Sequence, residues 1–164
     1  MHLINPMNGN IMQIISEHRK KLCKKVNSYN PNLVIDVGCG PFWSKSHNKI
    51  KNVIGFDREN WTKRPDVFAL PDLLCTIEEA DKIFKSKCAD IVMCMGSLHR
   101  TNEADIFPDF KIVYGWTRKF LIMRAVWTEE FIDKLTKEYN LVIDGEIENL
   151  ESKAGMKYWW WKIQ

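Results

Sequence analysis

The first part of the chain carries apolar residues at the spacing of one face of a helix. Between Asn10 and Val26 they stand three, four or seven positions apart, at Ile11, Ile14, Ile15, Leu22 and Val26. This stripe predicts an amphipathic helix over residues 10–26. We expect residues 1–31 to form an N-terminal helical segment that packs on the rest of the chain.

Short apolar runs follow, without the alternation of polar and apolar residues that marks a half-exposed strand. They are Leu33–Val37, Val53–Phe56, Ile91–Met95 and Phe120–Met123, with a shorter candidate at Val67–Leu70. Uninterrupted β-branched runs are typical of parallel strands that are covered on both faces. We therefore predict buried strands at these positions, with Val67–Leu70 as a short third strand.

Polar residues between these runs predict where helices begin. Thr76 followed by Glu79 is a capping-box pattern, and Thr128 followed by two glutamates starts a helix with an apolar face. Residues 104–116 are ambiguous. Pro108 lacks a backbone donor and is expected to prevent one uninterrupted helix there.

The end of the chain has a different pattern. Leu141–Leu150 and Met156–Ile163 are extended segments separated by a short turn sequence, which predicts a hairpin. Strands that alternate with helices and then end in a hairpin predict an α/β fold. Its sheet should be mostly parallel with one antiparallel strand.

The composition limits the class of protein. The chain has 164 residues, of which 45% are hydrophobic and 27% charged, which fits one globular domain over residues 1–164. No apolar run approaches the roughly 18 residues of a membrane span, and polar residues interrupt the N-terminus too early for a signal peptide. We expect a cytoplasmic protein.

The five cysteines form no C-x-x-C pair and the four histidines lack ligand spacing, so we expect reduced thiols and no metal.

Candidate binding residues stand where the predicted strands end. Asp36 and the glycine loop Gly38–Gly40 close the first strand, Asp57 closes the second, and Met95 closes the fourth. In open parallel sheets, ligands bind beyond the carboxyl ends of the strands. The glycines allow a sharp turn and a close approach of the backbone, and a carboxylate at Asp57 can accept hydrogen bonds from both hydroxyls of a ribose. This pattern predicts a nucleoside-containing ligand.

The glycine loop does not fit a dinucleotide. In the fingerprint G-x-G-x-x-G the third glycine position would be Trp43, where close helix–strand packing is needed. Pro41 removes a backbone N–H from the loop that would cradle a pyrophosphate. Asp36 would repel a pyrophosphate, whereas its carboxylate can neutralise the amino group of a methionine moiety.

These residues carry a family resemblance. Val34–Pro41 resembles the first motif, D-x-G-x-G, of class I S-adenosylmethionine-dependent methyltransferases, and Val53–Asp57 resembles their second motif. Asp72-Leu73 resembles the segment that holds the adenine, and Asp90–His99 is similar to the fourth strand with its loop. The resemblance extends from about Leu33 to the hairpin. It implies a Rossmann-like three-layer sandwich with a mostly parallel seven-stranded sheet and a C-terminal antiparallel hairpin.

The resemblance also implies a reaction, the transfer of a methyl group from S-adenosylmethionine to an unidentified acceptor with release of S-adenosylhomocysteine. The residues implied to bind the cofactor are Asp36, Gly38, Cys39, Gly40, Pro41, Asp57, Arg58, Asp72, Leu73 and Met95. His99, after the fourth strand, is the catalytic candidate, as a base that removes a proton from the acceptor. A solvent-facing loop histidine is the alternative for His99.

The chain departs from the family pattern. Phe42 stands where many members carry a third glycine, and the gaps after Gly40 and Asp57 leave room for only short crossover helices. No acceptor domain is inserted. Two other functions therefore stay open: a cofactor-binding module without turnover that acts through a partner, and an S-adenosylmethionine-consuming lyase or hydrolase.

The acceptor, whether small molecule, protein or RNA, is not specified by these motifs, and neither is the oligomeric state. The basic cluster Arg19–Lys25 could contact nucleic-acid phosphates, but the solvated face of a helix is favoured. No membrane partner is expected.

Trp159–Trp161 should point alternately to the two faces of a strand and pack there. The other tryptophans expected in loops near strand ends, where an acceptor could bind, are Trp61, Trp116 and Trp127.

Overall fold

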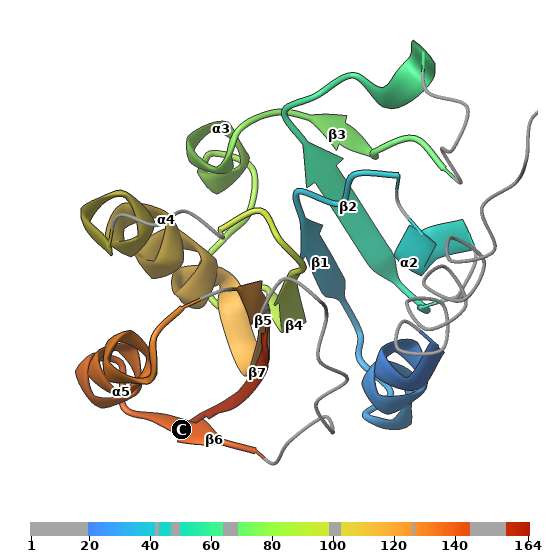
Figure 1. Cartoon of the computed structure of the whole chain (residues 1–164). Helices are drawn as coiled ribbons and strands as arrows, with labels where there is room; N and C mark the ends of the chain where they lie inside the picture. Colours follow the sequence, from blue (N-terminus) through green and yellow to red (C-terminus); the bar gives the residue numbers. More distant parts are fainter. Residues whose placement is uncertain are drawn as a thin grey trace, which may run out of the picture.

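A computed structural model describes residues 20–41, 43–46, 50–63, 69–98, 103–125, 127–144 and 157–164. The described residues form one seven-stranded sheet with the order β3-β2-β1-β4-β5-β7-β6. The strands are β1 (Val34–Val37), β2 (Val53–Asp57), β3 (Leu73–Leu74), β4 (Ala89–Cys94), β5 (Thr117–Ala125), β6 (Leu141–Ile143) and β7 (Lys157–Ile163). The first five strands are parallel, and β7 lies antiparallel between β5 and β6 (Figure 1).

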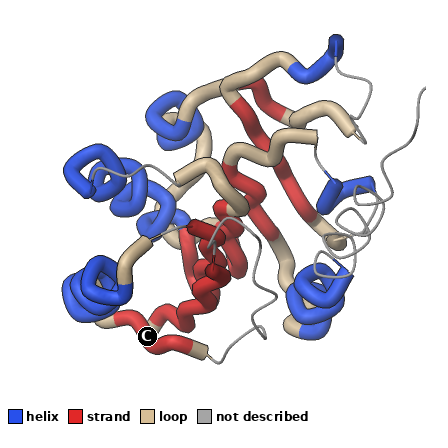
Figure 2. The backbone as a smooth tube through the Cα atoms, in the orientation of Figure 1, coloured by secondary structure: helices blue, strands red, loops and turns tan. Residues whose placement is uncertain are grey.

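Helices cover both faces of this sheet (Figure 2). On one side lie α3 (Ile77–Asp81), α4 (Glu103–Trp116) and α5 (Glu129–Glu138). On the other side lie a helix over residues 20–28 and the single turn α2 (Trp43–Ser46). The expected Rossmann-like three-layer sandwich, with its C-terminal antiparallel hairpin, is therefore confirmed.

The two faces of the sheet have separate hydrophobic cores. Along β1, Ile35 and Val37 belong to the core beneath α3, α4 and α5, whereas Val34 belongs to the core beneath the helix over residues 20–28. Because successive residues of a strand point to opposite faces, a strand covered on both sides needs apolar residues throughout. This explains why β1 is apolar at every position except Asp36, and the fully buried β4 follows the same rule except at Asp90.

The tryptophans of β7 divide between the two cores as expected. Trp161 lies in the core beneath α4 and α5 and stacks on Trp159, with ring centroids 6.3 Å apart. Trp160 faces the other core, where its ring lies 5.7 Å from that of Tyr29. Each side therefore gains aromatic surface from the same strand, which is the packing role that was predicted.

Most sequence-based boundaries agree with the structure. The capping box at Thr76 is present, with both reciprocal hydrogen bonds, and Thr128 caps α5 through the N–H of Phe131. The predicted N-terminal helix is observed over residues 20–28, and its earlier part lies outside the described residues. The hairpin expected at residues 141–150 and 156–163 is confirmed by the antiparallel pairing of β6 with β7, and residues 145–156 lie outside the described residues.

The prediction for Pro108 was wrong, because α4 continues through it. Pro108 is the sixth residue of the helix, so the hydrogen bond that it removes lies near the N-terminal end. The helix beyond it is fixed by three fully buried side chains on one face, Phe110, Val113 and Trp116. Tertiary packing of this face outweighs the loss of one backbone bond.

The third strand was also placed wrongly. Val67–Leu70 was expected, but Ala69 and Leu70 are not in a strand, and β3 is the two-residue segment Leu73–Leu74. β3 is an edge strand, and Leu74 exposes 61% of its surface, so no buried apolar run marks its position. In the described parts of the first two crossovers, the helical segments are the single turn α2 and the 3-10 turn η1 (Trp61–Lys63).

Within the described ranges, no helix is long and apolar enough to span a membrane.

Candidate functional site

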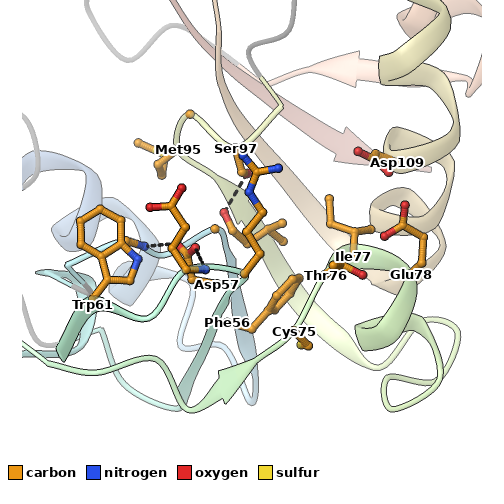
Figure 3. A pocket seen from close by; sticks show the side chains of 16 residues that line it. Phe56, Asp57, Trp61, Cys75, Thr76, Ile77, Glu78, Met95, Ser97 and Asp109 are labelled. Carbon is orange, nitrogen blue, oxygen red and sulfur yellow. Dashed lines mark hydrogen bonds between the residues drawn. The ribbon is translucent and has the colours of Figure 1, made fainter. Parts of the chain in front are cut away.

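A cavity of about 730 Å³ lies at the carboxyl ends of the central strands (Figure 3). Every parallel strand from β1 to β4 contributes residues at or just beyond its carboxyl end. The lining residues are Val37, Gly38, Gly40, Phe56, Asp57, Arg58, Glu59, Trp61, Cys75, Thr76, Ile77, Glu78, Met95, Gly96, Ser97 and Asp109. This is the edge of an open parallel sheet at which ligands bind.

Two glycines shape the loop after β1, and both have positive φ. Gly38 has φ +60°, and a Cβ added there would lie 2.4 Å from Cβ of Ser97. Ser97 is itself held in place, because its Oγ donates a 2.8 Å hydrogen bond to the carbonyl of Val37. Gly40 has φ +55°, and its added Cβ would make an ordinary 3.6 Å contact with the ring of Trp61. The loop thus leaves space beside Gly40 and none beside Gly38.

Asp57 joins the glycine loop to the end of β2. Its Oδ2 accepts a 2.8 Å hydrogen bond from the N–H of Gly40, and its Oδ1 accepts a 2.9 Å bond from the N–H of Glu59. The side chain is buried at the cavity wall. Each carboxylate oxygen has a second lone pair, so Asp57 is oriented by the protein and retains acceptor capacity toward the cavity.

Asp36 and Cys39 are not among the residues that line the cavity. Asp36 is buried in β1, and its carboxylate accepts a 2.5 Å hydrogen bond from the hydroxyl of Ser44 in α2. Burial raises the pKa of the Cys39 thiol well above its usual value, and the nearby carboxylates of Asp36 and Asp57 raise it further. Pro41 continues the loop, and its carbonyl accepts a hydrogen bond from the N–H of Ala69.

Asp72 and Leu73 are not among the residues that line the cavity, in contrast to the role expected from the motif. Asp72 precedes β3, where its carboxylate pairs with Lys45 and accepts a 3.0 Å hydrogen bond from the N–H of Gly55. The expectation depended on a third strand that ended before Asp72. Because β3 ends at Leu74, the residues beyond its carboxyl end are Cys75–Glu78, and these do line the cavity.

Arg58 and Met95 line the cavity as the sequence suggested. His99, the catalytic candidate, lies outside the described residues, so its placement stays a prediction.

Several lining residues were missed by sequence reasoning. Asp109 was missed because α4 was not expected to continue through Pro108, and Ser97 because its role depends on contact with the loop after β1. Trp61 was noted only as one of three loop tryptophans, and it is the one that reaches the cavity. Trp116 instead ends α4, where its Nε1 donates a 2.9 Å hydrogen bond to Asp81, and Trp127 packs in the same core.

The structure describes the lysines of the basic cluster Arg19–Lys25. Lys20, Lys21 and Lys24 are exposed on the helix over residues 20–28, and Arg19 lies outside the described ranges. Lys25 places its ammonium 4.3 Å from the centre of the Trp160 ring and donates to the carbonyl of Asp144. One of the cluster's charges therefore contributes to packing.

All five cysteines are described and are free thiols, as expected. Among the described residues no group of histidine, cysteine and acidic side chains could hold a metal ion.

No model of a known protein family matches the sequence, and no curated protein is similar to it. Solved structures are similar in fold. Magnesium protoporphyrin IX methyltransferase from Synechocystis, solved with bound S-adenosylmethionine, has a TM-score of 0.74 at 14% identity and covers 100% of this chain and 86% of its own. The 1,6-didemethyltoxoflavin-N1-methyltransferase of Burkholderia thailandensis, solved with S-adenosylhomocysteine, has a TM-score of 0.67 at 11% identity, covering 100% and 92%.

The methyltransferase domain of bacterial CtHen1-CN has a TM-score of 0.66 at 15% identity and covers 92% of this chain and 100% of its own. At these identities the likeness establishes a shared fold. The chain has the fold of class I S-adenosylmethionine-dependent methyltransferases, as its strand-end motifs implied.

Proposed function

We propose that this chain is an S-adenosylmethionine-dependent methyltransferase that methylates an unidentified acceptor and releases S-adenosylhomocysteine. One observation carries the proposal: Asp57 and the Gly38–Gly40 loop are joined by a hydrogen bond at the wall of a cavity at the carboxyl edge of the sheet. Solved structures of this fold hold the cofactor or its product.

The methionine, ribose and adenine portions of the cofactor would contact successive segments of the chain along the cavity. The methionine portion would pass over Gly38 and Gly40, with Asp36 behind them acting on the amino group through water. The free lone pairs of Asp57 would accept the ribose hydroxyls. We assign the adenine to the segment after β3, Cys75–Ile77, in place of Asp72-Leu73, because only the later segment lines the cavity.

The reaction itself requires positioning more than acid–base chemistry. A lone pair of the acceptor attacks the methyl carbon in line with the carbon–sulfur bond, and the bond's electrons remain on sulfur. The sulfonium becomes a neutral thioether, and the methylated acceptor loses a proton. His99 is proposed as the group that takes this proton where the acceptor needs a base.

The proposed acceptor is a small molecule, a protein or an RNA. Contact with nucleic acid through the basic cluster is not favoured, because exposed lysines on the outer face of a helix are ordinarily solvated. We place the protein in the cytoplasm.

Calorimetric titration with S-adenosylmethionine and S-adenosylhomocysteine tests the proposal. We expect the wild-type chain and the control Asp133→Ala, an exposed residue of α5, to bind both ligands. Asp57→Ala should lose at least about tenfold in affinity, since two charge-assisted hydrogen bonds are removed. Absence of binding by the wild type at about millimolar ligand, which corresponds to roughly 4 kcal/mol, refutes the proposal.

Turnover separates the methyltransferase from the two other functions. Product formed from the cofactor alone, without an acceptor, would indicate a lyase or hydrolase. Binding without product from any acceptor pool would indicate a module that acts through a partner.

A further inference from the structure

The cavity is lined by many more acidic than basic side chains. Asp57, Glu59, Glu78 and Asp109 contribute carboxylates, and Arg58 is the one basic side chain among the described lining residues. Figure 3 places Glu78 and Asp109 on one side of the cavity and Asp57 nearer to Trp61 and Met95. The acidic groups therefore surround the space in which a ligand would lie.

These carboxylates differ in how strongly solvent screens them. Asp57 and Asp109 are only 8% and 5% exposed, whereas Glu59 and Glu78 are exposed. Asp36 adds a fifth carboxylate behind the glycine loop, where it is 1% exposed. Charges that are removed from water act over longer distances and are less weakened by salt.

Two buried thiols lie close enough to these carboxylates for the carboxylates to raise their pKa. Burial is the main cause that raises the pKa of Cys39, just after β1, and Asp36 and Asp57 raise it further. Cys94, the last residue of β4, has its pKa raised by burial and then by Asp36 and Asp109. The carboxylates therefore disfavour any further negative charge at the carboxyl ends of β1 and β4.

We propose that this acidic lining distinguishes the two charge states of the cofactor, so that the cavity binds cationic S-adenosylmethionine more tightly than neutral S-adenosylhomocysteine. The inference rests on the proposed function and deepens it. The two molecules share adenine, ribose, amino group and carboxylate, and they differ in the methyl group and in the positive charge on sulfur. Contacts to the shared parts cancel in the ratio of their affinities, and the charge on sulfur remains.

The reaction would then weaken its own product complex. When the acceptor's lone pair forms the new bond to the methyl carbon, the electrons of the broken bond neutralise the sulfur. The attraction between the sulfur and the acidic lining ends at that step. The displaced proton and the methyl group leave with the acceptor and the solvent, so the neutral thioether dissociates more readily than the substrate.

The expected size of the effect follows from Coulomb's law. One unit charge about 10 Å from another changes an affinity by about twofold at the dielectric constant of water and by roughly 16-fold at the effective value of about 20 near a protein surface, before screening by salt. We expect wild-type protein to bind S-adenosylmethionine about tenfold more tightly than S-adenosylhomocysteine at about 0.05 M salt. At about 0.5 M salt this ratio should approach two.

Charge-removing variants test the role of individual carboxylates, with calorimetric affinities for both ligands as the readout. Asp109→Asn should lower the ratio by about threefold, and Glu59→Gln and Glu78→Gln by about twofold each, because their charges are screened by solvent. Glu138→Gln is the matched control. It removes an exposed carboxylate at the end of α5 and should leave the ratio unchanged.

Each outcome decides the inference. A ratio that falls in the lining variants and stays constant in the control supports it. A wild-type ratio of one or less, or lining variants that behave like Glu138→Gln, overturns it while leaving cofactor binding intact. Failure of both ligands to bind refutes the proposed function instead. Should Asp109→Asn fail to fold, the exposed Glu59 and Glu78 variants carry the test.

Discussion

A methyl group added at Gly38 would collide with Ser97, and the cost of that collision can be worked out from the structure. The new Cβ would lie 2.4 Å from Cβ of Ser97, and the backbone has φ +60°. Alanine in this left-handed region costs about 1–2 kcal/mol. Relief of the overlap adds about 1–3 kcal/mol. Displacement of Ser97 also weakens its 2.8 Å hydrogen bond to Val37, worth about 1 kcal/mol. We expect Gly38→Ala to lower the free energy of unfolding by about 3–6 kcal/mol.

Gly40→Ala is the matched control. Its φ of +55° gives the same backbone strain, but its added Cβ makes only a 3.6 Å contact with Trp61. The expected loss is therefore about 1–2 kcal/mol. Urea denaturation followed by circular dichroism measures both variants, and the difference between them isolates the collision with Ser97.

A second change tests the cause directly. Ser97→Gly removes the Cβ that Gly38→Ala would strike, so the double variant should recover about 1–3 kcal/mol relative to the sum of the two single changes. Equal losses for Gly38→Ala and Gly40→Ala, or additive effects in the double variant, would refute the reasoning.

Two further predictions concern the scaffold. Asp90 is buried, and although burial alone would raise its pKa, a 2.8 Å hydrogen bond from the N–H of Asn32 and two neighbouring basic side chains lower it below 3.8. A lowered folded-state pKa gives stability that is present above the unfolded value and lost as the pH falls below it. Asp90→Asn should therefore destabilise the protein at pH 6 and reduce the loss of stability on acidification, as measured by urea midpoints at about pH 6 and about pH 3. Thr76→Ala should cost about 1 kcal/mol, because Thr76 Oγ1 accepts from the N–H of Glu79 in the capping box. An unchanged urea midpoint would contradict this.

The sequence carries most of the fold because buried parallel strands leave a strong signal. Val34–Val37 and Ala89–Cys94 are apolar almost throughout, since both faces of each strand are covered. β3 leaves no such signal, because it has two residues and lies at an edge where Leu74 is exposed. Apolar runs in the sequence therefore predict the central strands of the sheet better than its edge strand β3.

The same contrast applies to the site. Asp57 and the two glycines were predicted because Asp57 ends β2 and the glycines stand just after β1. Ser97 and Asp109 were not, since one acts through a contact with a distant loop and the other lies on a helix that continues through a proline. Residues brought together by long-range packing leave no spacing in the sequence that local rules can detect.

The two-residue length of β3 at the edge of the sheet has a consequence for local stability. β3 pairs with β2 through two residues, whereas β7 pairs with β5 through six. β3 contributes little buried surface, because it has two residues and Leu74 is 61% exposed, and we expect it to separate from β2 more readily than the central strands separate from one another. A ligand that contacts Gly40, Asp57 and Cys75 binds only while β3 is paired with β2. A higher ligand concentration therefore lowers the fraction of molecules in which β3 has separated from β2. Amide hydrogens of β2 and β3 should accordingly exchange more slowly as ligand saturates, until their exchange requires global unfolding, as it does in the interior of β4 and β5.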